Sequence, residues 1–296
     1  MTEPLHYMEL HRIATLIECK EISPVEIAEH FLARIGSLEP KLNAFNLVTE
    51  ELARADAKKA EKDILRGNYR GALHGIPLAV KDIFDMADLP TTASMAIHWE
   101  SLANRDATVI SRLRDAGAVI LGKTNLTEGV YGEHLPPYGA PQNPWNEDYW
   151  PGASSSGSGV AVAGGLCAAA LGSETGGSIR LPSAANGVVG VKPTWGRVSR
   201  YGVFELAATL DHVGPMARSA RDAGMLLQAI AGAEPQDPTA AQVAVPDYDE
   251  ISEFDLSNIH IGIDSQWLAD TVDQETLSAF DRAVNDLAGL GSRKRE

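Results

Sequence analysis

The chain has 296 residues, of which 44% are hydrophobic and 22% are charged, and its formal net charge is −15. This composition is typical of a globular protein with a sizeable core, and it excludes a largely disordered chain. The net negative charge disfavours a protein that holds a nucleic-acid backbone by bulk electrostatics.

The first 66 residues predict two helices with a short strand between them. The earlier helix begins at the capping box Ser23-Pro24-Val25-Glu26, and we expect it to end at Gly36. The strand is expected at 44–48 and the second helix at 51–66. We therefore predict an N-terminal helical segment, 1–66, packed on a catalytic body, 67–296.

From about residue 75 onward, short apolar runs alternate with helical patterns. Strands are predicted at 76–80, 118–121, 167–171, 188–191 and 259–263, and helices at 107–116, 157–165, 219–231 and 273–287. The segment 233–256 is rich in Pro, Asp and Glu and predicts a surface loop. Strands separated by helices predict an α/β fold with helices on both faces of a sheet. After the last helix, we expect a polar tail at 292–296 where an α/β chain normally enters another strand.

Membrane, secretory and disulfide-rich classes are disfavoured. The best apolar stretch, 160–171, is short for a membrane span and contains Gly164 and Gly165. Residues 1–6 do not resemble a signal peptide, and Cys19 and Cys167 make neither a disulfide framework nor a zinc site. We expect a cytoplasmic protein without a metal or cofactor.

Residues 117–124 match the P-loop expression GxxxxGK[ST], yet we reject a nucleotide site there. A P-loop follows its strand, and its middle residues form an open turn around phosphate. In this chain the middle residues are Ala-Val-Ile-Leu, which are typical of the strand itself. These residues therefore belong to the apolar strand predicted at 118–121.

The serine cluster at 154–158 does not fit a Ser-His-Asp hydrolase. It lacks the G-x-S-x-G spacing of a nucleophile elbow. The histidines His74, His134 and His212 are scattered, and each is better explained as a surface or hydrogen-bonded side chain. The sequence therefore favours a serine site that needs no histidine.

Three polar features together predict such a site. Ser178 follows Gly176 and Gly177, whose bare backbone leaves N–H groups free to converge on an oxyanion. Ser154 lies in the upstream serine cluster, and Lys81 ends the apolar run 76–80. Each feature alone is explained by a turn, a helix cap or a surface lysine. These explanations do not account for the occurrence of all three features together at these spacings.

These residues and their surroundings resemble the amidase signature family. The resemblance covers nearly the whole chain and runs through the segments 75–82, 122–125, 143–145, 151–157, 176–180, 190–194, 196–199 and 210–215. It implies a mixed central β-sheet flanked by helices on both faces. Because family members normally continue beyond this point, we expect the fold to be truncated at the C-terminus.

The resemblance also implies a catalytic set. Ser178 would be the nucleophile, Ser154 the proton relay after a cis peptide bond from Ala153, and Lys81 the base. A free lysine has a pKa of about 10.4, so burial behind the strand must lower it. Asp82 is expected to face the other way, as strand neighbours do. The oxyanion hole would be formed by the backbone N–H groups of Thr175, Gly176, Gly177 and Ser178.

The function that the resemblance implies is hydrolysis of a carboxamide C–N bond through a serine acyl-enzyme, giving an acid and ammonia or an amine. One alternative is the glutaminase (A) subunit of a tRNA-dependent amidotransferase, the one case in which nucleic acid would be a partner. Another is an inactive truncated fragment. The expected partner is a small-molecule amide, and a homodimer is one possible assembly. Ala153, Ser156 and Glu174 depart from the usual family pattern.

Overall fold

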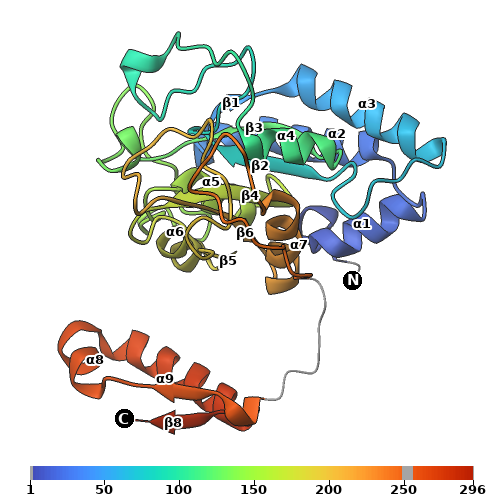
Figure 1. The fold of residues 1–296 in the computed structure, drawn as a ribbon. Helices are drawn as coiled ribbons and strands as arrows, with labels where there is room; N and C mark the ends of the chain where they lie inside the picture. The colour runs from blue at the N-terminus through green and yellow to red at the C-terminus, as the bar shows by residue number, and fades with distance from the viewer. Residues whose placement is uncertain (1–2, 249–255, 296) are drawn as a thin grey trace. The chain divides into compact units, whose positions relative to one another are not determined.

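The computed structural model describes residues 3–248 and 256–295. Contacts divide the chain into two units, Met1–Asp249 and Glu250–Glu296. In the first unit, helices surround one central sheet (Figure 1). The boundary between residues 66 and 67 that the sequence suggests stays a prediction.

The central sheet has six strands in the order β1-β3-β2-β4-β6-β5. They are β1 Phe45–Val48, β2 Pro77–Lys81, β3 Val119–Thr124, β4 Ala169–Glu174, β5 Val189–Gly190 and β6 His212–Ala217. β2 is parallel to both β3 and β4, whereas β1, β6 and β5 join in antiparallel pairs. The predicted mixed sheet is therefore confirmed.

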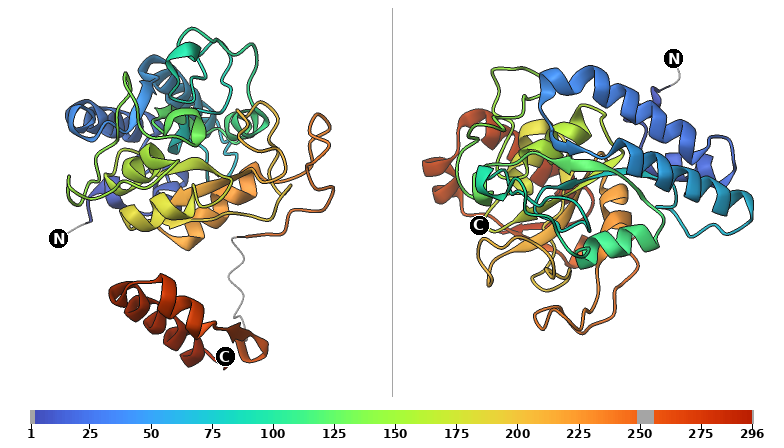
Figure 2. Two further views of the ribbon diagram at one scale, coloured as in Figure 1. Left: turned by 90° about the vertical axis from the view of Figure 1, so that its left-hand side faces the viewer. Right: turned by 90° about the horizontal axis from the view of Figure 1, so that it is seen from above.

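Helices cover both faces of this sheet (Figure 2). They are α1 Leu10–Glu18, α2 Pro24–Leu42, α3 Glu50–Leu65, α4 Thr108–Asp115, α5 Ser156–Ala163, α6 Arg180–Asn186 and α7 Ala220–Ile230. α3 packs on β3, α7 packs on β6, and α5 contacts β2, β4 and β6. Every residue of β2, β3 and β4 is buried, which explains why these strands are near-continuous apolar runs.

The capping box predicted at the start of α2 is present, but the predicted end of this helix is wrong. Ser23 Oγ accepts from the N–H of Glu26, and the Glu26 carboxylate accepts from the N–H of Ser23. The helix passes through Gly36 and ends at Leu42, followed by the C-cap Asn43, which has a left-handed backbone (φ 49°). Glycine costs a helix only about 1 kcal/mol, and buried apolar residues continue to Leu42.

Helix α1 and strand β6 of the first unit are among the elements that were not predicted. Helix α1 has a strongly amphipathic pattern and buries Leu10, Ile13 and Ile17. Strand β6 lies between β4 and β5, although Gly214 and Pro215 interrupt its sequence. Because both residues are depleted in strand interiors, the pattern did not indicate a strand.

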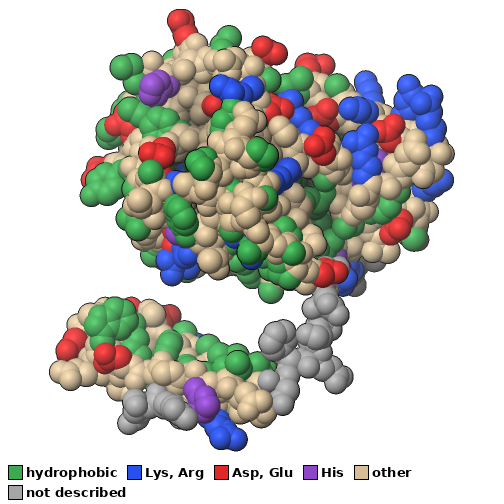
Figure 3. Space-filling model, viewed as in Figure 1, with side chains coloured by type: hydrophobic (Ala, Val, Ile, Leu, Met, Phe, Trp, Pro, Cys, Tyr) green, Lys and Arg blue, Asp and Glu red, His purple; other side chains and the backbone are tan. Residues whose placement is uncertain are grey.

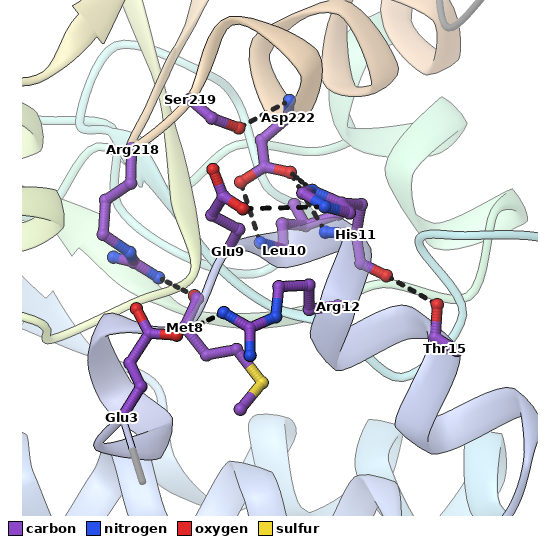
Figure 4. A network of polar contacts seen from close by, with 10 residues as sticks. All are labelled: Glu3, Met8, Glu9, Leu10, His11, Arg12, Thr15, Arg218, Ser219 and Asp222. Atoms are coloured by element: carbon purple, nitrogen blue, oxygen red, sulfur yellow. Dashed lines mark hydrogen bonds and ion pairs between the residues drawn. The ribbon is translucent and has the colours of Figure 1, made fainter. Parts of the chain in front are cut away.

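The start of α1 is anchored to α7 by one buried carboxylate (Figure 4). Asp222 is 0% exposed and accepts hydrogen bonds from the backbone N–H of Leu10 at 2.8 Å and of His11 at 3.0 Å. His11 Nδ1 lies 2.8 Å from the same carboxylate. Asp222 thus satisfies the free donors at the N-terminus of a helix that is distant from it in sequence.

The second unit has two short strands and two helices among its described residues. They are β7 His260–Gly262, α8 Ser265–Thr271, α9 Gln274–Gly289 and β8 Arg293–Arg295, after a 3-10 turn at Leu256–Asn258. β8 pairs in parallel with β7, so the segment expected to be a polar tail forms a strand instead. The loop predicted at 233–256 is irregular over 233–248, and its residues 249–255 lie outside the described part of the chain.

Charged side chains are dispersed over the surface of the first unit. On the face that Figure 3 shows, Lys and Arg are interspersed with Asp and Glu. Within residues 3–248 and 256–295, no helix combines the length and the apolar character needed to cross a membrane.

Candidate active site

Lys81 lies at the carboxyl end of β2 and is completely buried (0% exposed). Its Nζ is 2.7 Å from Ser154 Oγ and 2.9 Å from Ser173 Oγ. Burial holds the pKa of Lys81 well below its usual value, while the negative charges of Asp211 and Glu174 act in the opposite direction. The geometry therefore favours an uncharged amine between two hydroxyl groups.

Ser154 is held in the turn that precedes α5. Its peptide bond with Ala153 is cis, as the family resemblance implies. The turn begins at Gly152, whose φ of +81° suits glycine and whose added Cβ would lie 2.2 Å from Pro182 Cα. Only glycine fits there, so the close approach of this turn to α6 fixes the position of Ser154.

Ser178 lies in the turn between β4 and α6 and is partly exposed. Its carbonyl oxygen accepts a hydrogen bond of 3.2 Å from the N–H of Ser155, which brings the two serine segments side by side. The Ser178 hydroxyl makes no hydrogen bond to any residue in the described part of the chain. The structure therefore joins Lys81 to Ser154 directly and leaves the Ser178 hydroxyl unengaged.

The turn before Ser178 has the bare backbone that the sequence indicates. Gly176 is exposed with nothing near its Cβ position, and Gly177 has a φ of +126°. Within residues 3–248, the N–H groups of Gly176, Gly177 and Ser178 donate no hydrogen bond. Unused N–H donors beside a partly exposed hydroxyl are what an oxyanion site requires.

Glu174 fixes the far side of this turn. Its Oε2 accepts from the N–H groups of Ile179 at 3.0 Å and Arg180 at 3.1 Å, and its Oε1 accepts from Arg180 Nε at 2.8 Å. Burial raises the pKa of Glu174, but the hydrogen bonds from Arg180 and Ile179 outweigh it, so the net pKa is lowered. Although glutamate departs from the family pattern, here it spans the turn and holds it in place.

Asp82 points away from Lys81, as predicted from strand alternation. Its carboxylate pairs with Lys123 at 2.9 Å and accepts from Asn46 Nδ2 at 3.0 Å. Lys123 belongs to the buried strand β3 and also donates to Pro90 O at 2.6 Å. The strand predicted at 118–121 is therefore confirmed as part of β3, and Lys123, which follows it, is engaged in the core.

The three histidines that the sequence offered do not join the serines at the site. His134 Nε2 lies 2.7 Å from Ser156 Oγ, and His212 Nδ1 lies 3.2 Å from Glu174 O. His74 Nδ1 accepts from the N–H of Arg70 at 3.1 Å. None of the three forms a hydrogen bond with Ser154 or Ser178 in the part of the chain that the structure describes.

Sequence reasoning missed Ser173 and Asp211. Ser173 reaches Lys81 because β4 pairs in parallel with β2, with Val80 opposite Leu171, so that the carboxyl ends of the two strands lie side by side. The sequence carries no local signal for Ser173, because the pairing of β2 with β4 is not visible in it. Asp211 accepts a hydrogen bond from Thr175 Oγ1 across the turn.

Known proteins match nearly the whole length of this chain. A family model described as Amidase matches residues 26–296. The putative amidase AmiD of Mycobacterium tuberculosis is 46% identical over 286 residues, which is 96% of this chain and 59% of that protein. The glutamyl-tRNA(Gln) amidotransferase A subunit of Carboxydothermus hydrogenoformans is 42% identical over 290 residues, covering 97% of this chain and 60% of that protein.

Solved structures show the same fold. The native peptide amidase from Stenotrophomonas maltophilia superposes with a TM-score of 0.90 at 35% identity, covering 97% of this chain and 61% of that one. The chain thus spans about 60% of the length of the relatives that it matches.

Proposed function

The chain belongs to the amidase family, and we propose that it cleaves a carboxamide C–N bond through a serine acyl-enzyme, releasing an acid and ammonia or an amine. Ser178 attacks the amide carbonyl, and its proton passes through Ser154 to Lys81. The N–H groups of Thr175, Gly176 and Gly177, with that of Ser178, stabilise the oxyanion. The protonated relay then delivers the proton to the leaving amine, and water hydrolyses the acyl-enzyme to release the acid and regenerate Ser178.

One observation carries this proposal. Lys81 is fully buried, and within residues 3–248 and 256–295 its side chain donates to two hydroxyl groups and forms no ion pair with a carboxylate. A lysine that stabilises a fold is normally paired with an anion, as Lys123 is with Asp82. A desolvated lysine held against a serine is instead suited to accept that serine's proton.

The proposed transfer requires the Ser178 hydroxyl to turn toward Ser154. The hydrogen bond between Ser155 N–H and Ser178 O holds the two backbones together at 3.2 Å, which supports this step. Catalytic hydrogen bonds often tighten only when substrate is bound, so an unengaged hydroxyl is compatible with a nucleophile.

A serine-reactive fluorophosphonate tests the proposal without knowledge of the substrate. The expected result is a single adduct, mapped to Ser178 by peptide mass spectrometry and absent in Ser178→Ala. Lys81→Ala and Ser154→Ala should each slow labelling by about 100-fold or more, the usual contribution of a general base. Ser183→Ala removes a nearby buried hydroxyl that donates to Ile179 O, and it should label at the wild-type rate. Labelling of folded Ser178→Ala would exclude the proposed nucleophile.

The second candidate function is that of a glutaminase component of an amidotransferase, favoured by the 42% identity to the amidotransferase relative. The segment 129–137 does not resemble the usual sequence of such glutaminases, so we place the stand-alone amidase first. Ammonia release from simple carboxamides by the chain alone would support that order. Glutamine hydrolysis that appears only with added amidotransferase partner proteins would reverse it.

Three further points are proposals of the same kind. An inactive fragment would fold and yet give no adduct with the fluorophosphonate. A homodimer would be found by light scattering during gel filtration. A cytoplasmic location would be found by cell fractionation.

A further inference from the structure

We propose that Asp211 is a positioning residue of this site. Its carboxylate holds the turn at Thr175, forms no ion pair with a Lys or Arg among the described residues, and acts on Lys81 with its negative charge. The inference rests on the proposed function, in which Lys81 takes a proton from Ser178 through Ser154. It assigns Asp211 two separable effects, one on the geometry of the oxyanion site and one on the strength of the base.

The carboxylate of Asp211 links two loops. One oxygen accepts a hydrogen bond from Thr175 Oγ1, and the other accepts from the N–H groups of Leu206 at 2.8 Å and Ala207 at 2.9 Å. Thr175 is followed by Gly176, which has no side chain and nothing around its Cβ position. Packing therefore cannot hold the bare turn at this point, and the link through Thr175 supplies a restraint.

Asp211 also shares a cavity with a residue that contacts Lys81, the proposed base. Asp211 and Ser173 line the same small cavity, about 20 Å³ in volume, which is enough for roughly one water molecule. Ser173 Oγ is 2.9 Å from Lys81 Nζ. In agreement with this placement, the charge of Asp211 raises the pKa of Lys81 against the larger, opposite effect of burial.

The other charges around Lys81 are compensated. Glu174 on β4 faces it as well, but its carboxylate is paired with Arg180 on α6. Asp82, the next residue after β2, points to the opposite side and pairs with Lys123 on β3 at 2.9 Å. Within residues 3–248 and 256–295, no Lys or Arg forms an ion pair with Asp211, whose partners are a hydroxyl and two backbone N–H groups.

A carboxylate without an ion pair has a chemical consequence here, although Arg200 and His212 also line its cavity, because that cavity includes Ser173, a hydrogen-bond partner of the base. In the proposed function, Lys81 starts as a neutral amine and becomes an ammonium when Ser178 gives up its proton. A facing negative charge stabilises that ammonium, and so it strengthens the base at the moment of attack. Burial keeps the amine neutral beforehand, and Asp211 limits how far burial weakens it as a proton acceptor.

The test is the pH dependence of fluorophosphonate labelling at Ser178, measured by intact mass between about pH 5 and pH 10. The rate should rise with pH as Lys81 loses its proton. Asp211→Asn keeps the shape and removes the charge, so this rise should move to lower pH by about one unit. Its plateau rate should fall at least about tenfold as the turn loosens. Thr175→Val removes only the hydrogen bond to Asp211. It should therefore lower the plateau labelling rate and leave the pH at which the rate rises unchanged.

Asp237→Asn is the matched control. Asp237 is also a buried loop carboxylate, accepting from Arg200 N–H at 2.7 Å and Thr239 N–H at 2.9 Å, but it is not among the charges that act on Lys81. The Asp237→Asn variant should change neither the plateau labelling rate nor the pH at which the rate rises. Folded Asp211→Asn that labels with the wild-type pH profile would overturn the inference.

Two outcomes separate this inference from the function on which it rests. Wild-type protein that gives no adduct at any pH would remove the proposed function itself. Should Asp211→Asn fail to fold, as judged by circular dichroism, Asp211→Glu keeps the charge and displaces the link, so it should lower only the plateau. Wild-type plateaus in both Asp211→Glu and Thr175→Val would then refute the positioning role.

Discussion

Replacing Lys81 by methionine tests whether the buried amine is neutral in the folded protein, independently of any activity. Lys81 is 0% exposed and lies between two hydroxyl groups. Burial lowers its pKa in the folded state, while the unfolded chain keeps a pKa of about 10.4. Between these two values the unfolded chain binds one more proton than the folded protein does. Folding must therefore release that proton, and this costs stability as the pH falls.

The magnitude follows from that single proton. The free energy of unfolding of the wild type should rise by about 1.4 kcal/mol per pH unit relative to Lys81→Met, up to about pH 10.4, where the rise ends. The variant also leaves the hydroxyls of Ser154 and Ser173 without their amine partner, at about 1–3 kcal/mol each. That cost does not depend on pH, so it shifts the difference between the two proteins without changing its slope.

Chemical denaturation of both proteins between about pH 7 and pH 10, followed by circular dichroism, measures this slope. Other titrating groups are common to the two proteins and cancel in the difference. A positive slope is the expected result, because the depressed folded pKa makes stability increase toward alkaline pH. A flat difference over the whole range would mean that Lys81 stays charged when folded, and it would refute the reasoning.

Two further predictions concern the framework of the site. Gly152→Ala should lower the free energy of unfolding by at least about 2 kcal/mol, because the added Cβ meets Pro182 Cα at 2.2 Å in a left-handed backbone. In urea denaturation, the matched variant Gly36→Ala, which lies in α2 with open space around it, should instead gain about 0.5–1 kcal/mol. A Gly152→Ala protein as stable as wild type would show that the turn can relax. Asp222→Ala should cost about 2–4 kcal/mol because it leaves the N–H of Leu10 without its buried acceptor. Hydrogen exchange should then be faster in α1, and unchanged protection there would contradict the anchoring role.

The sequence predicted much of the sheet because three of its strands are buried on both faces. Continuous apolar runs marked β2 and β3, and the same property excluded a P-loop at 117–124. Strand β6 escaped prediction because Gly214 and Pro215 break its pattern, and it is held by pairing with β4 along its whole length. Such pairing is a long-range property that local propensity does not record.

The candidate site likewise contains some residues that the sequence marks locally and others that only long-range pairing brings into place. Ser154 and Ser178 stand out in the sequence because glycine-rich turns surround them, and Lys81 because it ends an apolar run. Ser173 and Asp211 have no such local mark. Ser173 is an ordinary polar residue in a strand, and it reaches Lys81 only because β4 lies beside β2. Asp211 reaches Thr175 only because β6 returns antiparallel to β4.

The central claim is that Ser178 attacks a carbonyl held by the backbone of its own turn, with Lys81 as the final proton acceptor. A crystal structure of the fluorophosphonate adduct tests it most directly. We predict a covalent bond between phosphorus and Ser178 Oγ, with the phosphoryl oxygen about 2.7–3.1 Å from the backbone nitrogens of Gly176 and Gly177. The hydrogen bond between Ser154 Oγ and Lys81 Nζ should remain. Phosphorus on another serine, or an oxygen turned away from that turn, would contradict the account.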